Sequence, residues 1–497
     1  MGKYYDQMMV IQQEVGDIHG ALALMGWDQE VYMPRKGAAT RGRQLATLSG
    51  MAHTRFISEE MGHAIERAGS EELTLDQQVN LREISWSHKR AGKLPTSLVK
   101  ALAETSSAAI EVWMQARADN DFPSFAPWVE KLVKLQKESA EAIGYENEPY
   151  DALLEEYEPG ASTQDISDVF EALRGPTVDL VQRIRNSEVK PRTDFLKKTY
   201  PVEDQRRFGV MVSKQMGFDY EAGRLDISPH PFCTHMGVQD VRLTTRYSQD
   251  LPAQSLYGII HETGHGLYEQ GQDVNHEGTP RGQSVSLGIH ESQSRMWENM
   301  VCRSRAFWRY FYPKFVETFP DSMQGVTEEE LYAAVNEVTP SLIRVEADEV
   351  TYNLHILLRF EIERGLFADV YTVDDLPDIW HAKMKEYFGI EPPDDRSGVL
   401  QDIHWSHGGF GYFPTYTLGN LYGAQFYDTA KQALPDLTEQ IAHGELLPLR
   451  EWLRENIHQL GMAYRPKDLV KQVTGKALSA DYFLAYMEEK FGALYEV

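Results

Sequence analysis

Ile260-His-Glu-Thr-Gly-His265 carries two histidines four positions apart. Apolar residues precede and follow it at helical spacing, and Pro252 and Gly271 bracket the segment as a helix start and a helix stop. Residues four apart in a helix project from one face about one turn apart, so both imidazoles can reach the same metal ion. We therefore expect a helix over residues 252–271 that carries two ligands of a metal centre.

Two glycines, Gly264 and Gly266, lie inside this predicted helix. Each glycine costs about 1 kcal/mol relative to alanine in a helix interior. The cost indicates that another backbone or a bound substrate approaches the helix closely at these positions.

A third ligand is expected because catalytic zinc usually takes three protein ligands, and two histidines with one glutamate are one such set. Glu291 is the candidate, in a second predicted helix that starts near Gly288 and runs into an apolar stretch. Glu298, two turns further along, is an alternative. His290 is another, but successive helix residues point about 100° apart, so His290 and Glu291 cannot both face one ion.

Glu262 is the expected general base. It is adjacent to one histidine and one turn from the other, which is a poor position for binding the same ion but a good one for taking a proton from the attacking water. The same carboxyl group can later deliver that proton to the leaving amine. One divalent metal per chain is expected, with Zn²⁺ preferred, although imidazole and carboxylate ligands also accept Co²⁺ or Mn²⁺.

The composition excludes several classes of protein. A formal net charge of −26 opposes binding to a phosphate backbone, so no nucleic acid partner is expected. No apolar run approaches the ~18 residues of a membrane span. Two cysteines, Cys233 and Cys302, are too few to stabilise a chain of 497 residues through disulfide bonds. Together with the lack of a signal-like start, they predict a cytoplasmic protein.

The rest of the chain is predicted to be mainly helical. Apolar residues recur at helical spacing near the start, after a capping box at Ser162, and near the end. Strand signal is confined to the region around residues 232–236 and to 241–247, separated by a turn at 237–240, which predicts a small antiparallel sheet. No repeat or flexible linker divides the chain, so we expect a single domain over residues 1–497.

Six separated motifs between about residues 230 and 405 resemble those of the Taq-type thermostable metallocarboxypeptidases. They read His230-Pro-Phe232, Asp240-Val-Arg-Leu-Thr244, His261-Glu-Thr-Gly-His265, His290-Glu-Ser-Gln293, Ile343-Arg-Val-Glu-Ala-Asp348 and Gly398-Val-Leu-Gln-Asp-Ile-His-Trp405. Trp27-Asp28 with Met33-Pro34, and the segment 150–160, also look like this family, so the resemblance covers the whole chain.

The resemblance implies a two-lobed helical body with a deep active-site groove and a small sheet beside the metal site. It implies a cytoplasmic homodimer that hydrolyses peptides with a free C-terminal carboxylate and releases single amino acids. It also favours Glu291 over His290 as the third ligand.

Further site residues are carried over from the family individually. Arg344 resembles the group that receives the terminal carboxylate, for which a guanidinium fork is suited, although Arg344 and Asp348 are also spaced as a simple helix ion pair. His404 and Tyr416 resemble donors to the oxyanion, and Tyr412 competes with Tyr416 for that role. The resemblance implies that three more residues lie near the groove, and for these we favour a structural role over contact with substrate: His230, Arg242 and Gln401.

Two alternative functions remain open from the sequence. An oligopeptidase or dipeptidyl carboxypeptidase would use the same ligands and differ only in where the groove places the cleaved bond. A metal-stabilised protein that binds peptides without cutting them would have no use for the Glu262 carboxylate, so the intact motif disfavours it.

Overall fold

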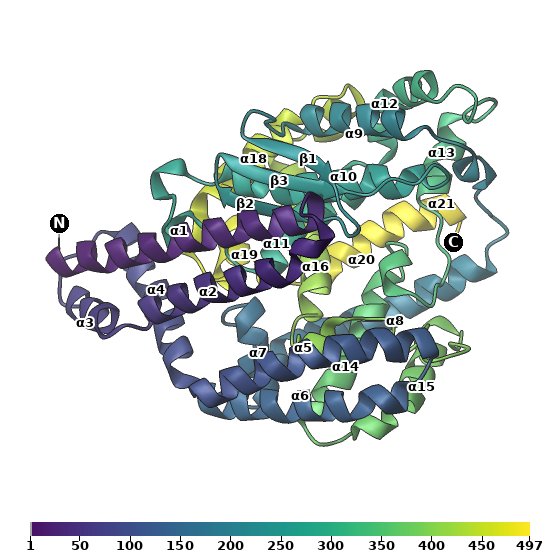
Figure 1. Ribbon diagram of the computed structural model, residues 1–497. Coiled ribbons are helices and arrows are strands. Elements are labelled where there is room, and N and C mark those ends of the chain that lie inside the picture. Colours follow the sequence, from purple (N-terminus) through teal and green to yellow (C-terminus); the bar gives the residue numbers. More distant parts are fainter. Residues whose placement is uncertain (1) are drawn as a thin grey trace.

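A computed structural model describes residues 2–497, and it is mainly helical with a single small sheet (Figure 1). At the N-terminal end, two long helices run side by side and project from the rest of the molecule. A small separate core, which includes Met8, Ile11, Met61 and Ile84, holds the first of these two helices against the third and fourth helices of the chain. These elements are α1 (Lys3–Val31), α2 (Ala38–Phe56), α3 (Glu59–Ala68) and α4 (Leu75–Lys93).

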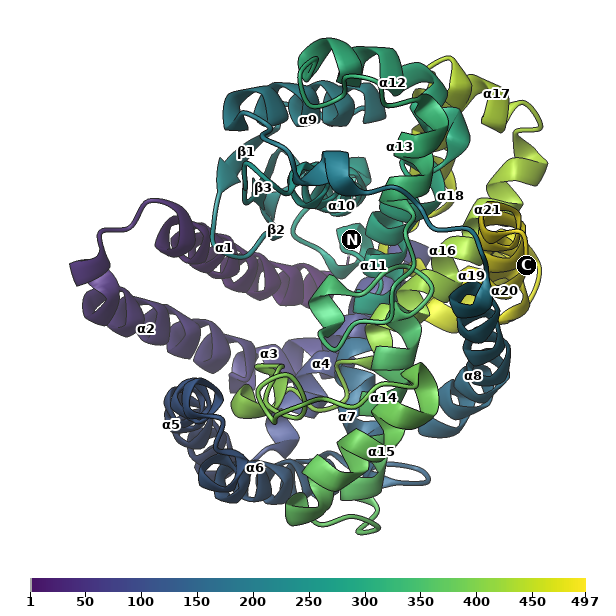
Figure 2. The ribbon, with the colours of Figure 1, turned by 90° about the vertical axis from the view of Figure 1, so that its right-hand side faces the viewer.

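One lobe of the body, at the bottom of Figures 1 and 2, is formed by helices from two distant parts of the chain. They are α5 (Thr96–Asp119), α6 (Phe122–Ile143), α7 (Pro149–Tyr157), α14 (Tyr352–Phe367) and α15 (Leu376–Phe388), with α8 (Thr163–Asn186) beside them. The Ser162 hydroxyl accepts from the backbone N–H of Asp165 at the start of α8. The N-cap predicted at Ser162 is therefore confirmed, but the capping box is incomplete, because the Asp165 carboxylate accepts from the Ser162 hydroxyl and not from its backbone N–H.

The other lobe contains the sheet, with β1 (Gly223–Ile227), β3 (Asp240–Thr245) and β2 (Cys233–Gly237) in that order. The predicted antiparallel pair, β2 with β3, is confirmed, and an irregularity falls between His235 and Gly237. The sheet is mixed, however, because β1 pairs parallel to β3. The sequence analysis missed β1, whose five residues include two charged side chains and bury only Leu225.

Helix α10 (Pro252–Gly271) packs against the sheet and has the bounds that Pro252 and Gly271 predict. It contacts β3, α9 (Val202–Met216) and α11 (Leu287–Arg295), which continues as a π-helix over Met296–Val301. On its other side α11 packs along α16 (Pro414–Ala433). The helix pair α10 and α11 is thus packed between the sheet, α9 and α16, and its remaining face lines the groove described below.

The remaining helices cover the outside of this core. The apolar stripe predicted near the end of the chain is confirmed, since Phe483, Met487 and Phe491 are all buried. Within residues 2–497 no helix has both the length and the apolar character needed to cross a membrane. These covering helices are α12 (Arg305–Thr318), α13 (Glu328–Val335), α17 (Leu437–Ala442), α18 (Leu447–Asn456), α19 (Pro466–Thr474), α20 (Asp481–Met487) and α21 (Ala493–Tyr495).

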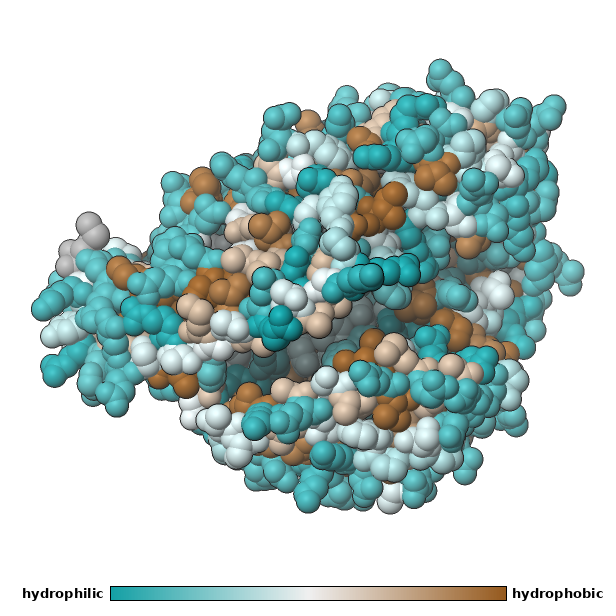
Figure 3. Space-filling model, in the orientation of Figure 1, coloured by the Kyte–Doolittle hydropathy of each residue, from teal (hydrophilic) through white to brown (hydrophobic). Residues whose placement is uncertain are grey.

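A groove with a cavity volume of about 1320 Å³ opens between α1, the sheet and the helix pair α10 and α11. Its walls come from α1, from strand β2, from the loop between α10 and α11, and from α10, α11 and α16. Figure 3 shows the surface hollowed between the upper and lower parts of the molecule. The two-lobed helical body with a groove and a sheet beside it is therefore confirmed, with α1 as one wall that the sequence did not predict.

Candidate metal centre and groove

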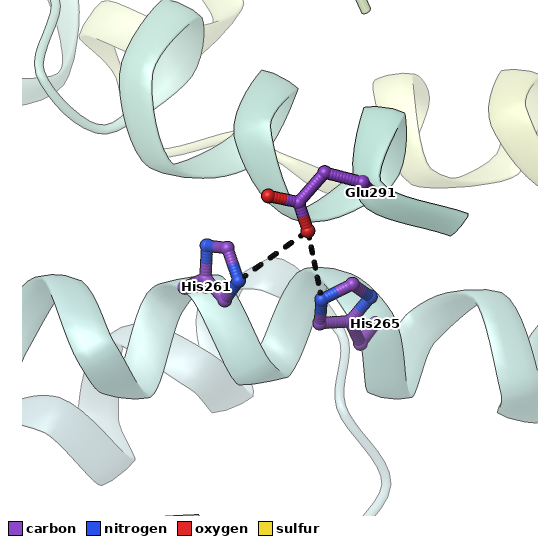
Figure 4. A group of neighbouring side chains, drawn as sticks. All are labelled: His261, His265 and Glu291. Atoms are coloured by element: carbon purple, nitrogen blue, oxygen red, sulfur yellow. Dashed lines mark ion pairs between the residues drawn. The ribbon is translucent and has the colours of Figure 1, made fainter. Parts of the chain in front are cut away.

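Helices α10 and α11 bring His261, His265 and Glu291 together at the base of the groove (Figure 4). Glu291 Oε2 lies 3.7 Å from His261 Nε2 and 3.3 Å from His265 Nε2. Two imidazole nitrogens and one carboxylate oxygen that converge in this way form a donor set that suits a zinc-type divalent cation. Among the described residues this is the one cluster with ligand atoms close enough to share an ion.

The three candidate ligands are held by other polar groups. His261 Nδ1 lies 2.9 Å from Glu298 Oε2, which leaves Nε2 free to face the cluster. Glu298, the alternative ligand, therefore contacts the outer edge of His261. Arg295 Nε donates to Glu291 Oε1 at 2.7 Å, and Oε2 stays directed at the imidazoles. Burial would raise the pKa of Glu291, but Arg295 and the two histidines outweigh it and hold the pKa well below its usual range.

Glu262 faces the groove beside this cluster without belonging to it. Its side chain is buried, and burial raises the pKa of its carboxyl group to about 7, an effect that His261 partly opposes. A carboxyl group in this position can take a proton from a water molecule held between it and the cluster.

Gly264 is explained by close packing of one helix backbone on another, whereas the space beside Gly266 is filled by the side chains of Phe218 and Leu243. A Cβ atom on Gly264 would lie 2.6 Å from Ser294 Cα and 2.7 Å from the Gln293 carbonyl oxygen. Gly419 of α16 makes a similar approach on the other side of α11, where a Cβ would lie 2.6 Å from Glu291 Cβ. Of the two explanations expected from the sequence, approach of another backbone is the observed one at Gly264.

Replacing Gly264 by alanine is expected to lower the free energy of unfolding by at least about 2 kcal/mol, because the new methyl group would press on backbone atoms that cannot rotate away. It is also expected to weaken metal binding, since α10 and α11 must separate. Urea unfolding of the two proteins measures the change. Gly258→Ala, in the same helix with 3.4 Å to Thr245 Oγ1, is the matched control and is expected to be neutral or stabilising. Equal stability of the Gly264 variant would contradict the packing argument.

Tyr412 and Tyr416 line the groove near Glu291, and His404 lies against both rings, with centroid distances of 5.3 and 6.3 Å. Tyr412 and Tyr416 are 5.4 Å apart, so the structure brings both candidate oxyanion donors together with His404. Burial lowers the pKa of His404 to about 3, which makes it a neutral imidazole with one N–H to donate.

Arg344 lies behind the groove wall, under the rings of Tyr416 and Phe413. Its Nε and Nη2 donate to Asp402 Oδ1 and its Nη1 donates to the Tyr352 hydroxyl. Arg359 holds the other oxygen of Asp402. The ion pair of Arg344 with Asp348 that its spacing permits is not formed.

Three residues implied to lie near the groove are not part of its walls. Arg242 pairs with Asp240, and its guanidinium carbon lies 4.3 Å from the ring centre of Trp27, so it ties α1 to the sheet. Gln401 Oε1 accepts from the backbone N–H of Arg344, which fixes that segment. His230 is exposed, and its carbonyl oxygen accepts from Ser228.

Several supporting residues were missed in the sequence analysis. Arg295 follows Glu291 by four positions, and Glu269 follows His265 by four, so helical spacing could have indicated both. No local pattern connects Asp402 to Arg344 or places the α1 residues Gln12, Gly16 and Gly20 on the groove wall.

A helical protein with this donor set at the base of a groove is a metallopeptidase by class, and its metal-binding helix carries the sequence His261-Glu-Thr-Gly-His265. The family model of carboxypeptidase Taq (M32) metallopeptidases matches residues 7–491. The chain is 44% identical to thermostable carboxypeptidase 1 of Thermus thermophilus over 99% of both chains. It is 35% identical to carboxypeptidase 1 of Bacillus subtilis over 99% of both. The structure of an M32 carboxypeptidase from Deinococcus radiodurans superposes with a TM-score of 0.98 at 40% identity, covering 100% of each chain. The chain belongs to the carboxypeptidase Taq (M32) family.

Proposed function

We propose that this enzyme hydrolyses the last peptide bond of peptides that carry a free C-terminal carboxylate and releases single amino acids. The observation that carries the proposal is the convergence of His261 Nε2, His265 Nε2 and Glu291 Oε2 beside Glu262 at the base of the groove. A cluster of this kind at the base of an open groove is accessible to an extended peptide.

In the proposed reaction a divalent cation, when bound by these three residues, supplies Lewis-acid activation of water and of the scissile carbonyl. Glu262 takes a proton from the attacking water and later delivers it to the leaving amine. The hydroxyl of Tyr416 or Tyr412 and the N–H of His404 donate to the oxyanion that develops. The neutral state of His404 supports this role, because a neutral imidazole donates without adding a charge to the buried site.

Arg344 is proposed to receive the terminal carboxylate of the peptide. Three of its nitrogens already donate to Asp402 and Tyr352, which leaves two of the five N–H bonds of a guanidinium for a substrate. Among residues 2–497, no lysine or arginine lies on the groove wall itself, and the proposal assigns this duty to Arg344, whose guanidinium carbon lies 5.0 Å from the ring centre of Tyr416 on that wall.

Several finer properties are part of the proposal. Zn²⁺ is the preferred ion, supported by the two imidazoles and one carboxylate. We further propose that residues 1–497 act as one catalytic domain, that the enzyme is a homodimer, and that it works in the cytoplasm, where two unpaired cysteines stay reduced.

The test is a mass-spectrometric time course on an N-acetylated peptide offered with a free or an amidated carboxyl end, with and without a chelator. Stepwise loss of single residues from the free-acid peptide alone, abolished by the chelator, is expected. Internal cuts or loss of dipeptides would assign an oligopeptidase or dipeptidyl carboxypeptidase instead. No cleavage by the metal-loaded protein would leave only the non-catalytic peptide-binding alternative.

A further inference from the structure

The two imidazoles of the candidate metal centre have different outer partners. His261 Nδ1 reaches a carboxylate directly, that of Glu298. His265 Nδ1 instead contacts Nδ1 of a second histidine, His290. His290 Nε2 in turn lies 2.6 Å from Glu269 Oε1. His265, His290 and Glu269 therefore form a hydrogen-bonded chain of two imidazoles and one carboxylate.

Each hydrogen bond in this chain has one possible direction when a metal is bound. A contact between two ring nitrogens needs one N–H and one lone pair. If His265 gives the lone pair of Nε2 to a metal, its proton is on Nδ1 and must be donated there. His290 Nδ1 is then the acceptor, so the proton of His290 is on Nε2 and is donated to Glu269.

The outer end of the chain is firmly held. Glu269 lies in α10, one turn after His265, and its side chain is 3% exposed. Its Oε2 accepts from Gln272 Nε2 at 3.0 Å and faces His235 Nδ1 of strand β2 at 3.2 Å. The ring of His290 also packs against Tyr268, with 5.1 Å between centroids. His290 and Glu269 therefore have little freedom to reorient.

We propose that His290 and Glu269 are positioning residues for the metal: they fix the orientation and the proton of His265 so that its Nε2 lone pair points at Glu291. His290 does this without binding the ion, although it is adjacent to Glu291 in the sequence. The inference rests on the metal ligands of the proposed function and is independent of which peptide bond is cut.

The test compares the zinc affinity of the metal-free enzyme and its variants by competition with a chelator of known affinity. His290→Phe keeps a ring of similar shape but removes both hydrogen bonds, and it is expected to bind Zn²⁺ about 10- to 100-fold more weakly. Glu298→Gln, which weakens the direct support of His261, is the positive control. His235→Gln is the matched negative control, because it removes a half-exposed contact of Glu269 but keeps the chain, so a change below about threefold is expected.

If His290→Phe does not fold, a second variant and a second measurement still test the inference. Glu269→Gln retains an acceptor for His290 but no charge, and about tenfold weaker zinc binding is expected. In nitrogen-15 spectra of the zinc-loaded wild-type enzyme, the protons are expected on Nδ1 of His265 and on Nε2 of His290. Unchanged zinc affinity of the folded variants, or a His290 proton found on Nδ1, would overturn the inference. Because zinc binding is measured without substrate, a failed peptidase assay leaves this test intact.

Discussion

Replacing Glu262 by glutamine is expected to lower kcat by about 10²- to 10⁴-fold, the usual contribution of a positioned general base. The amide keeps the shape of the side chain but cannot take a proton from water. KM is expected to change little, since Glu262 acts on the water and not on the bound peptide. Steady-state kinetics on the free-acid peptide measure both parameters.

Zinc content and thermal unfolding of this variant control for indirect effects. The zinc content is expected to match that of the parent protein, because Glu262 lies outside the three-residue cluster, and the melting temperature is expected to be no lower, because a neutral amide avoids the burial cost that raises the pKa of this carboxyl group. Glu221→Gln removes the same charge at an exposed position before β1 and is expected to leave kcat unchanged. A Glu262 variant that keeps full zinc and more than about a tenth of the parent activity would require another base.

The helix that carries the metal-binding motif could be predicted because its signals are local. Pro252, Gly271 and the four-residue spacing of the histidines all lie within one element, and α10 has those bounds. The same is true of Glu291 on α11, where a second helix follows from apolar spacing alone. Local periodicity identifies which side chains share a face, and the resemblance then indicates which faces meet.

The features that could not be predicted depend on contacts between distant residues. Strand β1 exists because it pairs with β3, some 18 positions further on, and its own pattern is too short and too polar to indicate a strand. Asp402 neutralises an arginine 58 positions away. The wall formed by α1 lies more than 200 positions before the motifs, so no spacing rule connects it to the groove.

Replacing Arg344 by lysine is expected to lower kcat/KM for free-acid peptides by about 30- to 1000-fold. This factor corresponds to a loss of roughly 2–4 kcal/mol of binding free energy, which is typical when one partner of a buried charge pair is impaired. Lysine keeps the charge that Asp402 needs but not the planar fork that can hold Asp402 and a carboxylate together. Most of the loss is expected in KM. Peptides with an amidated end are expected to be poor substrates of both proteins, so the preference for the free acid should shrink.

Arg359→Lys separates carboxylate recognition from support of Asp402. Arg359 holds the other oxygen of Asp402 and is fully buried, so its variant is expected to lose stability, as a disturbed buried ion pair does. It is not proposed to touch the peptide, and the ratio of free-acid to amide cleavage should stay that of the parent. A different result would contradict the proposal: both variants lose stability equally, and both keep the parent's ratio of free-acid to amide cleavage. Arg344 would then serve only to hold the loop of Asp402. The terminal carboxylate would have to be recognised by the metal centre or by His404 and the tyrosines beside it.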